Sequence, residues 1–416
     1  MIEKYLLGKT SYGGEIYWLE AEEPWEIPAL RCVMSTGKIK KEKASIEDAI
    51  SYFNKNPSES KGLVDRVYTQ KHSSIGELSR EGIYLKGVSR LFTFVGWMPI
   101  GAPRGVQGVG TEKSLRRVKA KDFVDKGEKN IKELCENAFR LYEELAKAGY
   151  ELEDARYILP LATKTEEIMQ IPLGRELGKW SNYLSSLYFT EAGEVGKILK
   201  DLNSEKSGLK VDELPSRENY MPMFVRDKIP QRKWLESVEG YEYTPPHFDT
   251  LLIGVKGSIA SFHQQVRDRQ ERILWPSWEE VAMNDKYVLP SPLKPRSCLI
   301  GDIYKTAQDL GEDFWKEGKI ESAIFSQPLG KEIHVISTIH GRDNIIYTFM
   351  LRTCQMAQQE IRSRFREAAK EIEMKFGSRL GPRCVIEGKC YEARRKECPQ
   401  YRPDFEPEIF IHKLKD

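Results

Sequence analysis

The run Leu351-Arg352-Thr353-Cys354-Gln355-Met356-Ala357-Gln358-Gln359-Glu360-Ile361-Arg362 mixes apolar residues with amides and guanidiniums at helical spacing. Read as one helix, it places Arg352, Met356 and Gln359 on the same face. A helix that only covers a core carries apolar side chains on its inward stripe. The alternative reading is a solvated amphipathic helix. The pattern predicts a helix and makes Arg352 a candidate functional residue.

This run resembles the C-terminal signature of the flavin-dependent thymidylate synthases, which has the pattern Arg-Thr-Cys-x-x-Ala-Gln-x-Glu-Ile-Arg. In that family the first arginine activates the uracil ring, and the Ala-Gln-x-Glu-Ile-Arg segment builds the helix under the flavin. The resemblance implies that Arg352 is catalytic and that Gln358 contacts the cofactor.

The same order of motifs occurs twice along the chain. Glu153-x-Ala155-x-Tyr157-x-x-Pro160-Leu161 returns as Glu321-x-Ala323-x-Phe325-x-x-Pro328-Leu329, Gly174-Arg175-Glu176 as Gly341-Arg342-Asp343, and Ser89 as Ser258. The three offsets are 168, 167 and 169 residues. Unrelated matches would scatter more widely, so the sequence predicts a tandem duplication. The predicted boundaries are 1–205 for the first repeat, 206–225 for a polar linker, and 226–416 for the second repeat with its cysteine-containing tail.

The first repeat carries two motifs that resemble those of the family. In His72-Ser73-Ser74-x-x-Glu77, the resemblance implies that His72, Ser74 and Glu77 contact the flavin. In the motif that begins at Glu153, it implies that Arg156 contacts the nucleotide. The family hallmark, Arg-His-Arg followed by Ser and Arg-Tyr, has no match at the corresponding segment 97–101, which lacks basic residues.

The second repeat carries the complementary motifs. Gln264-Gln265-Val266-Arg267-Asp268-Arg269 resembles the hallmark with Asp268 in place of its histidine, and Ser277 matches its later serine. Glu279 and Glu280 replace its Arg-Tyr. The resemblance implies that Gln264, Arg267 and Ser277 hold the nucleotide and that Arg269 holds FAD. Since each repeat lacks what the other keeps, we expect composite sites.

These residue types suit the chemistry that the resemblance implies. Guanidiniums bind a phosphate dianion through paired hydrogen bonds, and a cation at the pyrimidine edge stabilises negative charge on the activated ring. For any one of these arginines taken alone, a structural ion pair is the alternative.

The implied activity is a methyl transfer that converts dUMP to dTMP with FAD, NADPH and methylene-tetrahydrofolate or a related pterin. The implied assembly is a homodimer that imitates the family's tetramer. Two alternatives follow from the departures at Asp268 and Glu279. In the first, the chain is a divergent paralogue that binds a nucleotide or flavin without methylating it. In the second, it is a relative that acts on another pyrimidine.

The resemblance also implies an α+β fold, with two tandem domains that each pack long helices on a curved, mainly antiparallel sheet. Periodicity by itself predicts mixed α and β structure. Helices are expected over 45–53, 128–148 and 174–184, and a β-like run over 83–94.

Composition excludes several classes of protein. The 65 basic residues are balanced by 63 acidic ones, a net charge of +2 that argues against a nucleic-acid binder. The sequence shows neither a membrane-length apolar run nor a signal peptide, so a cytoplasmic protein is expected. Three of the seven cysteines, Cys384, Cys390 and Cys398, cluster near the end. Their spacing fits no common zinc site, so we expect reduced thiols or one disulfide there, and no metal.

Overall fold

The computed structural model describes residues 1–36, 46–56, 58, 62, 81–100, 106–208, 240–243, 250–266, 271–376, 380–388, 390 and 398. By contacts the chain divides into two compact units. Unit 1 holds residues 1–228, 258–260 and 276–333, and unit 2 holds residues 229–257, 261–275 and 334–416.

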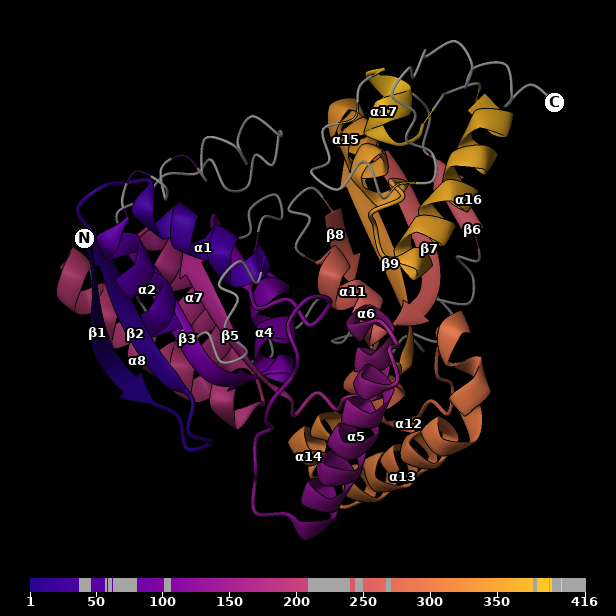
Figure 1. Cartoon of the computed structure of the whole chain (residues 1–416), viewed down its shortest axis with the longest axis horizontal. Coiled ribbons are helices and arrows are strands. Elements are labelled where there is room, and N and C mark those ends of the chain that lie inside the picture. The colour runs from indigo at the N-terminus through magenta and orange to yellow at the C-terminus, as the bar shows by residue number, and fades with distance from the viewer. Residues whose placement is uncertain are drawn as a thin grey trace. The chain divides into compact units, whose positions relative to one another are not determined.

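Unit 1 is built on an antiparallel sheet with the strand order β1-β2-β3-β5-β4 (Figure 1). Its strands are β1 (Ile2–Lys9), β2 (Glu15–Ala21), β3 (Glu81–Ser89), β4 (Val109–Glu112) and β5 (Lys164–Gln170). Alternate residues of β2 and β3 face opposite sides of the sheet. Both sides are therefore available for packing.

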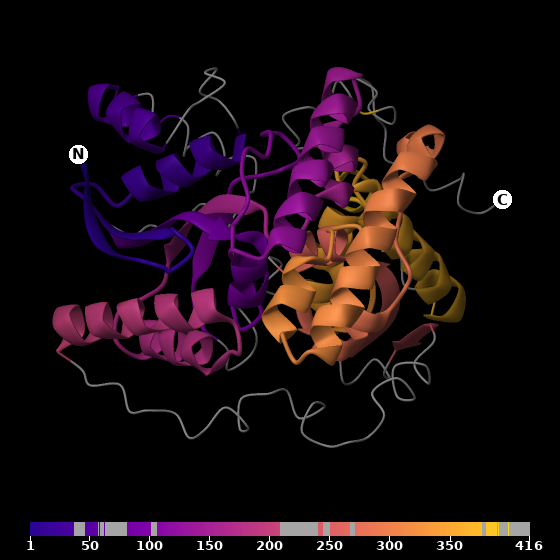
Figure 2. The same cartoon turned by 90° about the horizontal axis from the view of Figure 1, so that it is seen from below.

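Helices cover both faces of this sheet, as Figure 2 shows. On one face, α1 (Glu26–Thr36) and α2 (Ile46–Lys55) pack with Leu19, Tyr84 and Ile168. On the other face lie α7 (Arg175–Ser186) and α8 (Thr190–Ser207), where the Lys206 ammonium lies over the Trp18 ring.

The remaining helices of unit 1 belong to both predicted repeats. They are α4 (Arg90–Trp97), α5 (Lys129–Lys147), α6 (Leu152–Ala155), η2 (Arg156–Ile158), α12 (Trp278–Met283), η4 (Ser291–Arg296), α13 (Ser297–Lys316) and α14 (Ile320–Phe325). The buried side chains of α5 recur every three or four residues, because such residues share one face of a helix.

Unit 2 contains a second sheet, with the strand order β6-β7-β9-β8. The strands are β6 (Gly240–Tyr243), β7 (Thr250–Ser258), β8 (Glu271–Leu274) and β9 (Glu332–His340). The helices are α11 (Ile259–Gln265), α15 (Arg342–Arg352), α16 (Gln359–Phe376) and α17 (Arg383–Ile386). Phe349 of α15 and Phe365 of α16 pack with Ile253 and Ile339 of the sheet in one apolar core.

The order β2-β3-β5-β4 in the first sheet parallels the order β6-β7-β9-β8 in the second. Matching backbone hydrogen bonds also occur within unit 1. Arg90 N donates to Thr163 O at 2.8 Å, and Ile259 N donates to Lys331 O at 3.0 Å. Leu91 N donates to Leu161 O at 3.0 Å, and Ala260 N donates to Leu329 O at 2.8 Å. The two predicted repeats therefore have similar local hydrogen bonds and a similar strand order.

The predicted α+β class, with antiparallel sheets and many helices, is confirmed. The helices predicted over 45–53, 128–148 and 174–184 correspond to α2, α5 and α7. The two compact units have other boundaries than the predicted repeats, because residues 276–333 of the second predicted repeat belong to unit 1. Most of the predicted linker 206–225 lies outside the described residues.

Two local predictions were wrong. The β-like run 83–94 is a strand only to Ser89, whose hydroxyl accepts a hydrogen bond from Phe92 N and caps α4. The stretch 351–362 is not one helix, because α15 ends at Arg352 and α16 begins at Gln359. Every residue of α4 is buried, so its sequence has no polar face that would mark a helical period, which explains the first error.

Candidate functional site

The predicted site residues divide into three groups. His72, Ser74, Glu77, Arg267 and Arg269 lie outside the described residues. Arg156 and Ser277 belong to unit 1, and Gln264, Arg352 and Gln358 belong to unit 2.

Arg156 lies at the start of the short helix η2, directly after α6. Its side chain is buried, and its Nε donates to the backbone carbonyl of Glu153 at 3.3 Å. Burial is the main reason why the pKa of its guanidinium falls to about 10; Tyr157 and Glu153 oppose this shift, and the positive charges of Arg116 and Arg90 add to it. Arg156 is therefore one of three guanidiniums whose charges influence one another.

Arg116 was not among the predicted site residues, although its positive charge acts on Arg156. Its guanidinium binds the Glu153 carboxylate through two nitrogens, with Nε 2.8 Å from Oε1 and Nη2 3.0 Å from Oε2. The signal was present, because Ser114-Leu115-Arg116 repeats the order of serine and arginine in the second half of the family hallmark.

Arg90 is the most deeply buried of the three guanidiniums. It forms an ion pair with Glu112, and its Nη2 donates to the Lys113 carbonyl at 2.7 Å. The Thr93 hydroxyl also donates to Glu112, at 3.0 Å. Burial lowers the pKa of Arg90 to about 9, while the carboxylate of Glu167 raises it. Glu112 thus balances the charge of Arg90.

The three guanidiniums together form a site whose chemistry suits a phosphate. Arg116 is about one quarter exposed, so it can reach a ligand in solvent, whereas Arg90 is 3% exposed. Planar guanidiniums bind phosphate oxygens through charge-assisted hydrogen bonds, and Arg116 already binds a carboxylate by one such bond, from Nη2 to Glu153 Oε2. Arg116 and Arg156 are the better candidates for direct contact.

Ser277 lies at the N-terminus of α12. Its hydroxyl accepts a hydrogen bond from Glu280 N at 3.1 Å, which caps the helix. The residue therefore has a structural role, and its predicted contact with a nucleotide stays a prediction.

In unit 2, Arg352 ends α15 and is nearly buried. Its Nε lies 3.5 Å from Glu271 Oε1, and its Nη2 donates to the Gln265 carbonyl at 3.3 Å. Glu271, the first residue of β8, was also missed by sequence reasoning, because no motif connects it with a residue so far along the chain.

The two predicted glutamines of unit 2 differ in their surroundings. The side-chain oxygen of Gln264 is buried and accepts no hydrogen bond from the described residues, which fits an atom that binds a ligand. Gln358 is buried just before α16, where its carbonyl accepts from Arg362 N at 2.9 Å. Its side-chain amide can both donate and accept, which suits the polar edge of a flavin ring.

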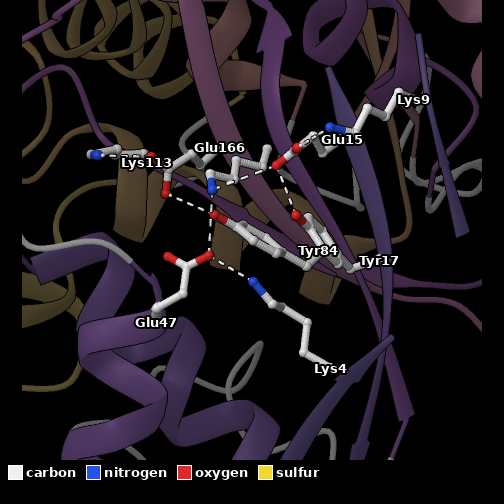
Figure 3. Close-up of polar contacts among 9 residues, drawn as sticks. Lys4, Lys9, Glu15, Tyr17, Glu47, Tyr84, Lys113 and Glu166 are labelled. Atoms are coloured by element: carbon white, nitrogen blue, oxygen red, sulfur yellow. Dashed lines mark hydrogen bonds and ion pairs between the residues drawn. The ribbon is translucent and has the colours of Figure 1, made fainter. Parts of the chain in front are cut away.

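Unit 1 carries a second polar cluster, which the sequence did not predict (Figure 3). It consists of Lys4, Lys9, Glu15, Tyr17, Glu47, Tyr84, Lys86, Lys113 and Glu166. The Lys4 ammonium lies 2.6 Å from Glu47 and 4.2 Å from the Tyr17 ring centroid. Tyr17 stacks on Tyr84 with the ring centroids 5.6 Å apart. Ammonium and carboxylate groups lie side by side in this cluster and neutralise one another.

The described cysteines are free thiols in this structure. Cys384 lies close enough to Cys354, Cys390 and Cys398 for their thiolate charges to raise its pKa, although burial is the larger cause. Across the described ranges, no group of three His, Cys, Asp or Glu residues is arranged to hold a metal ion. Among the helices that the structure describes, none has both the length and the apolar character of a membrane span.

Residues 106–177 match the family described as thymidylate synthase complementing protein. The matched segment runs from just before β4 into the first turn of α7 and contains Arg116, Glu153 and Arg156. No curated protein matches the chain. The resemblance to the flavin-dependent thymidylate synthases is therefore confirmed over residues 106–177, the segment that carries two of the three clustered guanidiniums.

Proposed function

We propose that this protein is a flavin-dependent thymidylate synthase-like methyltransferase that converts dUMP to dTMP. The one-carbon donor is methylene-tetrahydrofolate or a related pterin, and NADPH supplies the reducing equivalents. The observation that carries the proposal is the group of guanidiniums within and beside the matched segment, where the charges of Arg116 and Arg90 act on Arg156.

In this proposal Arg116 and Arg156 hold the phosphate of the nucleotide, because guanidiniums give it paired, charge-assisted hydrogen bonds. Gln264 contributes its buried amide oxygen, which can accept from the uracil N–H. Arg352 stabilises negative charge on the pyrimidine ring. Arg267 and Ser277 complete the predicted nucleotide contacts.

FAD, when bound, supplies the hydride chemistry, and the protein provides orientation and a dry site. The proposed contacts with FAD are His72, Ser74, Glu77, Arg269 and Gln358. The amide of Gln358 fits such a contact by its donor and acceptor chemistry.

We also propose that the chain is a tandem duplication that assembles as a homodimer. The parallel strand orders of the two sheets support this origin, as do the matching hydrogen bonds that begin α4 and α11. Helices α8 and α16, each 18 residues long, occupy corresponding places in the two repeats. If each chain carries two copies of the domain, two chains supply the four domains of the family's tetramer.

A second candidate function is supported by the carboxylates beside two of the arginines. Glu271 lies next to Arg352 and Glu112 next to Arg90, so part of the positive charge that an anionic ligand would meet is already balanced. A divergent paralogue that binds a nucleotide or flavin without methylating it, or that acts on another pyrimidine, would show such pairs.

Spectroscopy and product analysis of the purified protein test the first candidate. With FAD bound, NADPH should bleach the flavin absorbance without oxygen, and dUMP with methylene-tetrahydrofolate should restore it and yield dTMP. Arg352→Ala should abolish dTMP formation. Arg140→Ala removes an exposed arginine of α5 and should keep it. A protein that binds dUMP or FAD but forms no dTMP supports the second candidate.

A further inference from the structure

Glu271 is a buried carboxylate at the start of β8, and its side chain has no exposed surface. Its Oε2 accepts hydrogen bonds from the Ser337 hydroxyl at 2.8 Å and from the side-chain amide of Gln265. Its Oε1 faces Arg352. The donors on Oε2 fix the plane of the carboxylate, so Oε1 has a defined position.

Arg352 meets this carboxylate with one edge of its guanidinium. Nε lies 3.5 Å from Glu271 Oε1, and Nη2 donates to the Gln265 carbonyl at 3.3 Å. Gln265 therefore contacts both partners, through its side chain to Glu271 and through its backbone to Arg352. The pair and Gln265 form one connected polar network within unit 2.

A network of this kind has two physical consequences. A buried ion pair is costly to desolvate unless further hydrogen bonds hold it, and here Ser337 and Gln265 supply them to the carboxylate. The guanidinium is thereby oriented before any ligand binds, which reduces the entropy lost on binding. The nearby negative charge also opposes the binding of an anion, because the interaction between charges is strong where water is excluded.

We propose that Glu271 is a positioning residue for Arg352 and that its charge weakens the affinity of the chain for anionic pyrimidine nucleotides. The proposal rests on the proposed function, because it takes Arg352 to act on the pyrimidine ring. The Glu271 side chain has two effects: it orients the Arg352 guanidinium, and its negative charge opposes the binding of an anion. Different substitutions remove one effect and keep the other.

Glu271→Gln tests the charge. The amide has nearly the same shape, can still accept from Ser337, and carries no charge. In calorimetric titrations of the full-length protein at low ionic strength, its affinity for dUMP should rise about tenfold. Its affinity for deoxyuridine, which has no phosphate charge, should stay within about twofold.

Glu387→Gln is the matched control. It also removes one carboxylate charge from unit 2, and Glu387 Oε1 lies 3.6 Å from the Nε of Arg383, a similar ion-pair distance. Its affinity for dUMP should equal that of the wild type. An equal gain in both variants would show that the effect belongs to net charge, and would overturn the proposal.

Glu271→Asp tests the orientation. It keeps the charge but shortens the side chain by about one methylene, which takes the carboxylate away from Nε. KM for dUMP should stay near the wild-type value while kcat falls, because the arginine remains charged but is less well held. A higher KM with unchanged kcat, so that saturating dUMP restores the full rate, would contradict a positioning role. Thermal unfolding of both variants identifies any that is misfolded.

The results separate this proposal from the function on which it rests. If the wild type binds dUMP and Glu271→Gln binds it no more tightly, the role of Glu271 is overturned and the proposed function stands. If neither protein binds dUMP, the proposed function fails and this inference fails with it. A gain for dUMP without a gain for deoxyuridine supports both.

Discussion

The carboxylate of Glu191 accepts two hydrogen bonds from Ser89, a residue 102 positions earlier in the chain. The backbone amide of Ser89 donates at 3.1 Å and its hydroxyl donates at 2.5 Å. The same hydroxyl accepts from Phe92 N and caps α4. Glu191 of α8 therefore fixes the point at which β3 ends and α4 begins. Ser258 and Glu360 are separated by the same number of residues in the second predicted repeat.

Glu191→Gln should remove a pH dependence of stability. Burial raises the pKa of the Glu191 carboxyl from 4.5 to about 7, although the hydrogen bonds from Ser89 lower it. A folded-state pKa above the unfolded value favours the protonated form, so its stabilisation is complete below pH 4.5 and is lost as pH rises through 7. The wild type should lose roughly 3 kcal/mol over this window, and Glu191→Gln should lose less. Denaturant unfolding at intervals from pH 4.5 to 8 measures both, and equal slopes would refute the assignment.

Glu321→Gln should destabilise unit 1 through the N-terminus of α8. The Glu321 carboxylate accepts from Thr190 N at 2.9 Å, from Tyr12 OH at 2.9 Å and from Lys126 Nζ at 3.0 Å. Loss of a charged helix cap and a nearly buried ion pair should cost about 1–3 kcal/mol of unfolding free energy. Glu317→Gln, which removes an exposed partner of Lys319, should change it by less than about 0.5 kcal/mol. Similar losses in the two variants would argue against a capping role.

In the wild type, the free energy of unfolding should rise between pH 7 and 10, and Lys331→Met should abolish this rise. Lys331 is buried, with its ammonium 2.6 Å from Gln308 Oε1 and 4.6 Å from the Tyr287 ring centroid. Burial lowers its pKa from 10.5 to about 7, while Asp285 and Glu312 raise it. The stability linked to this group is therefore complete above pH 10.5 and is lost as pH falls through 7.

Unfolding measurements between pH 7 and 10 should show this rise in the wild type and not in Lys331→Met. Lys129→Met is the control, because Lys129 is exposed on α5. It should keep the wild-type slope. A variant of Lys331 that keeps the slope would show that other groups produce it.

Arg116→Ala should weaken dUMP binding by tenfold or more, which corresponds to about 1.4 kcal/mol. The reason is the loss of charge-assisted hydrogen bonds, together with the Glu153 carboxylate that is left without its ion-pair partner. Arg117→Ala removes the neighbouring, exposed arginine and should change the affinity less than about twofold. Titration with dUMP compares them, and equal affinities would remove Arg116 from the proposed site.

The sequence predicted those helices whose pattern is local. In α5, Ile131, Leu134, Ala138 and Leu141 recur at helical spacing, and all are buried in the structure. The same local reasoning failed for 83–94, where every residue of α4 is buried and the apolar pattern has no period. The hydrogen bonds of Ser89 with Phe92 and Glu191 decide that boundary, and Glu191 lies far along the chain.

The sequence by itself determined the repeated order of motifs and the presence of Arg156 and Arg352, because motif spacing and residue type are properties of the chain alone. Only the tertiary structure paired Arg116 with Glu153 and Arg352 with Glu271. A charge has no intrinsic partner: its partner is the opposite charge that folding brings within a few ångströms and shields from water.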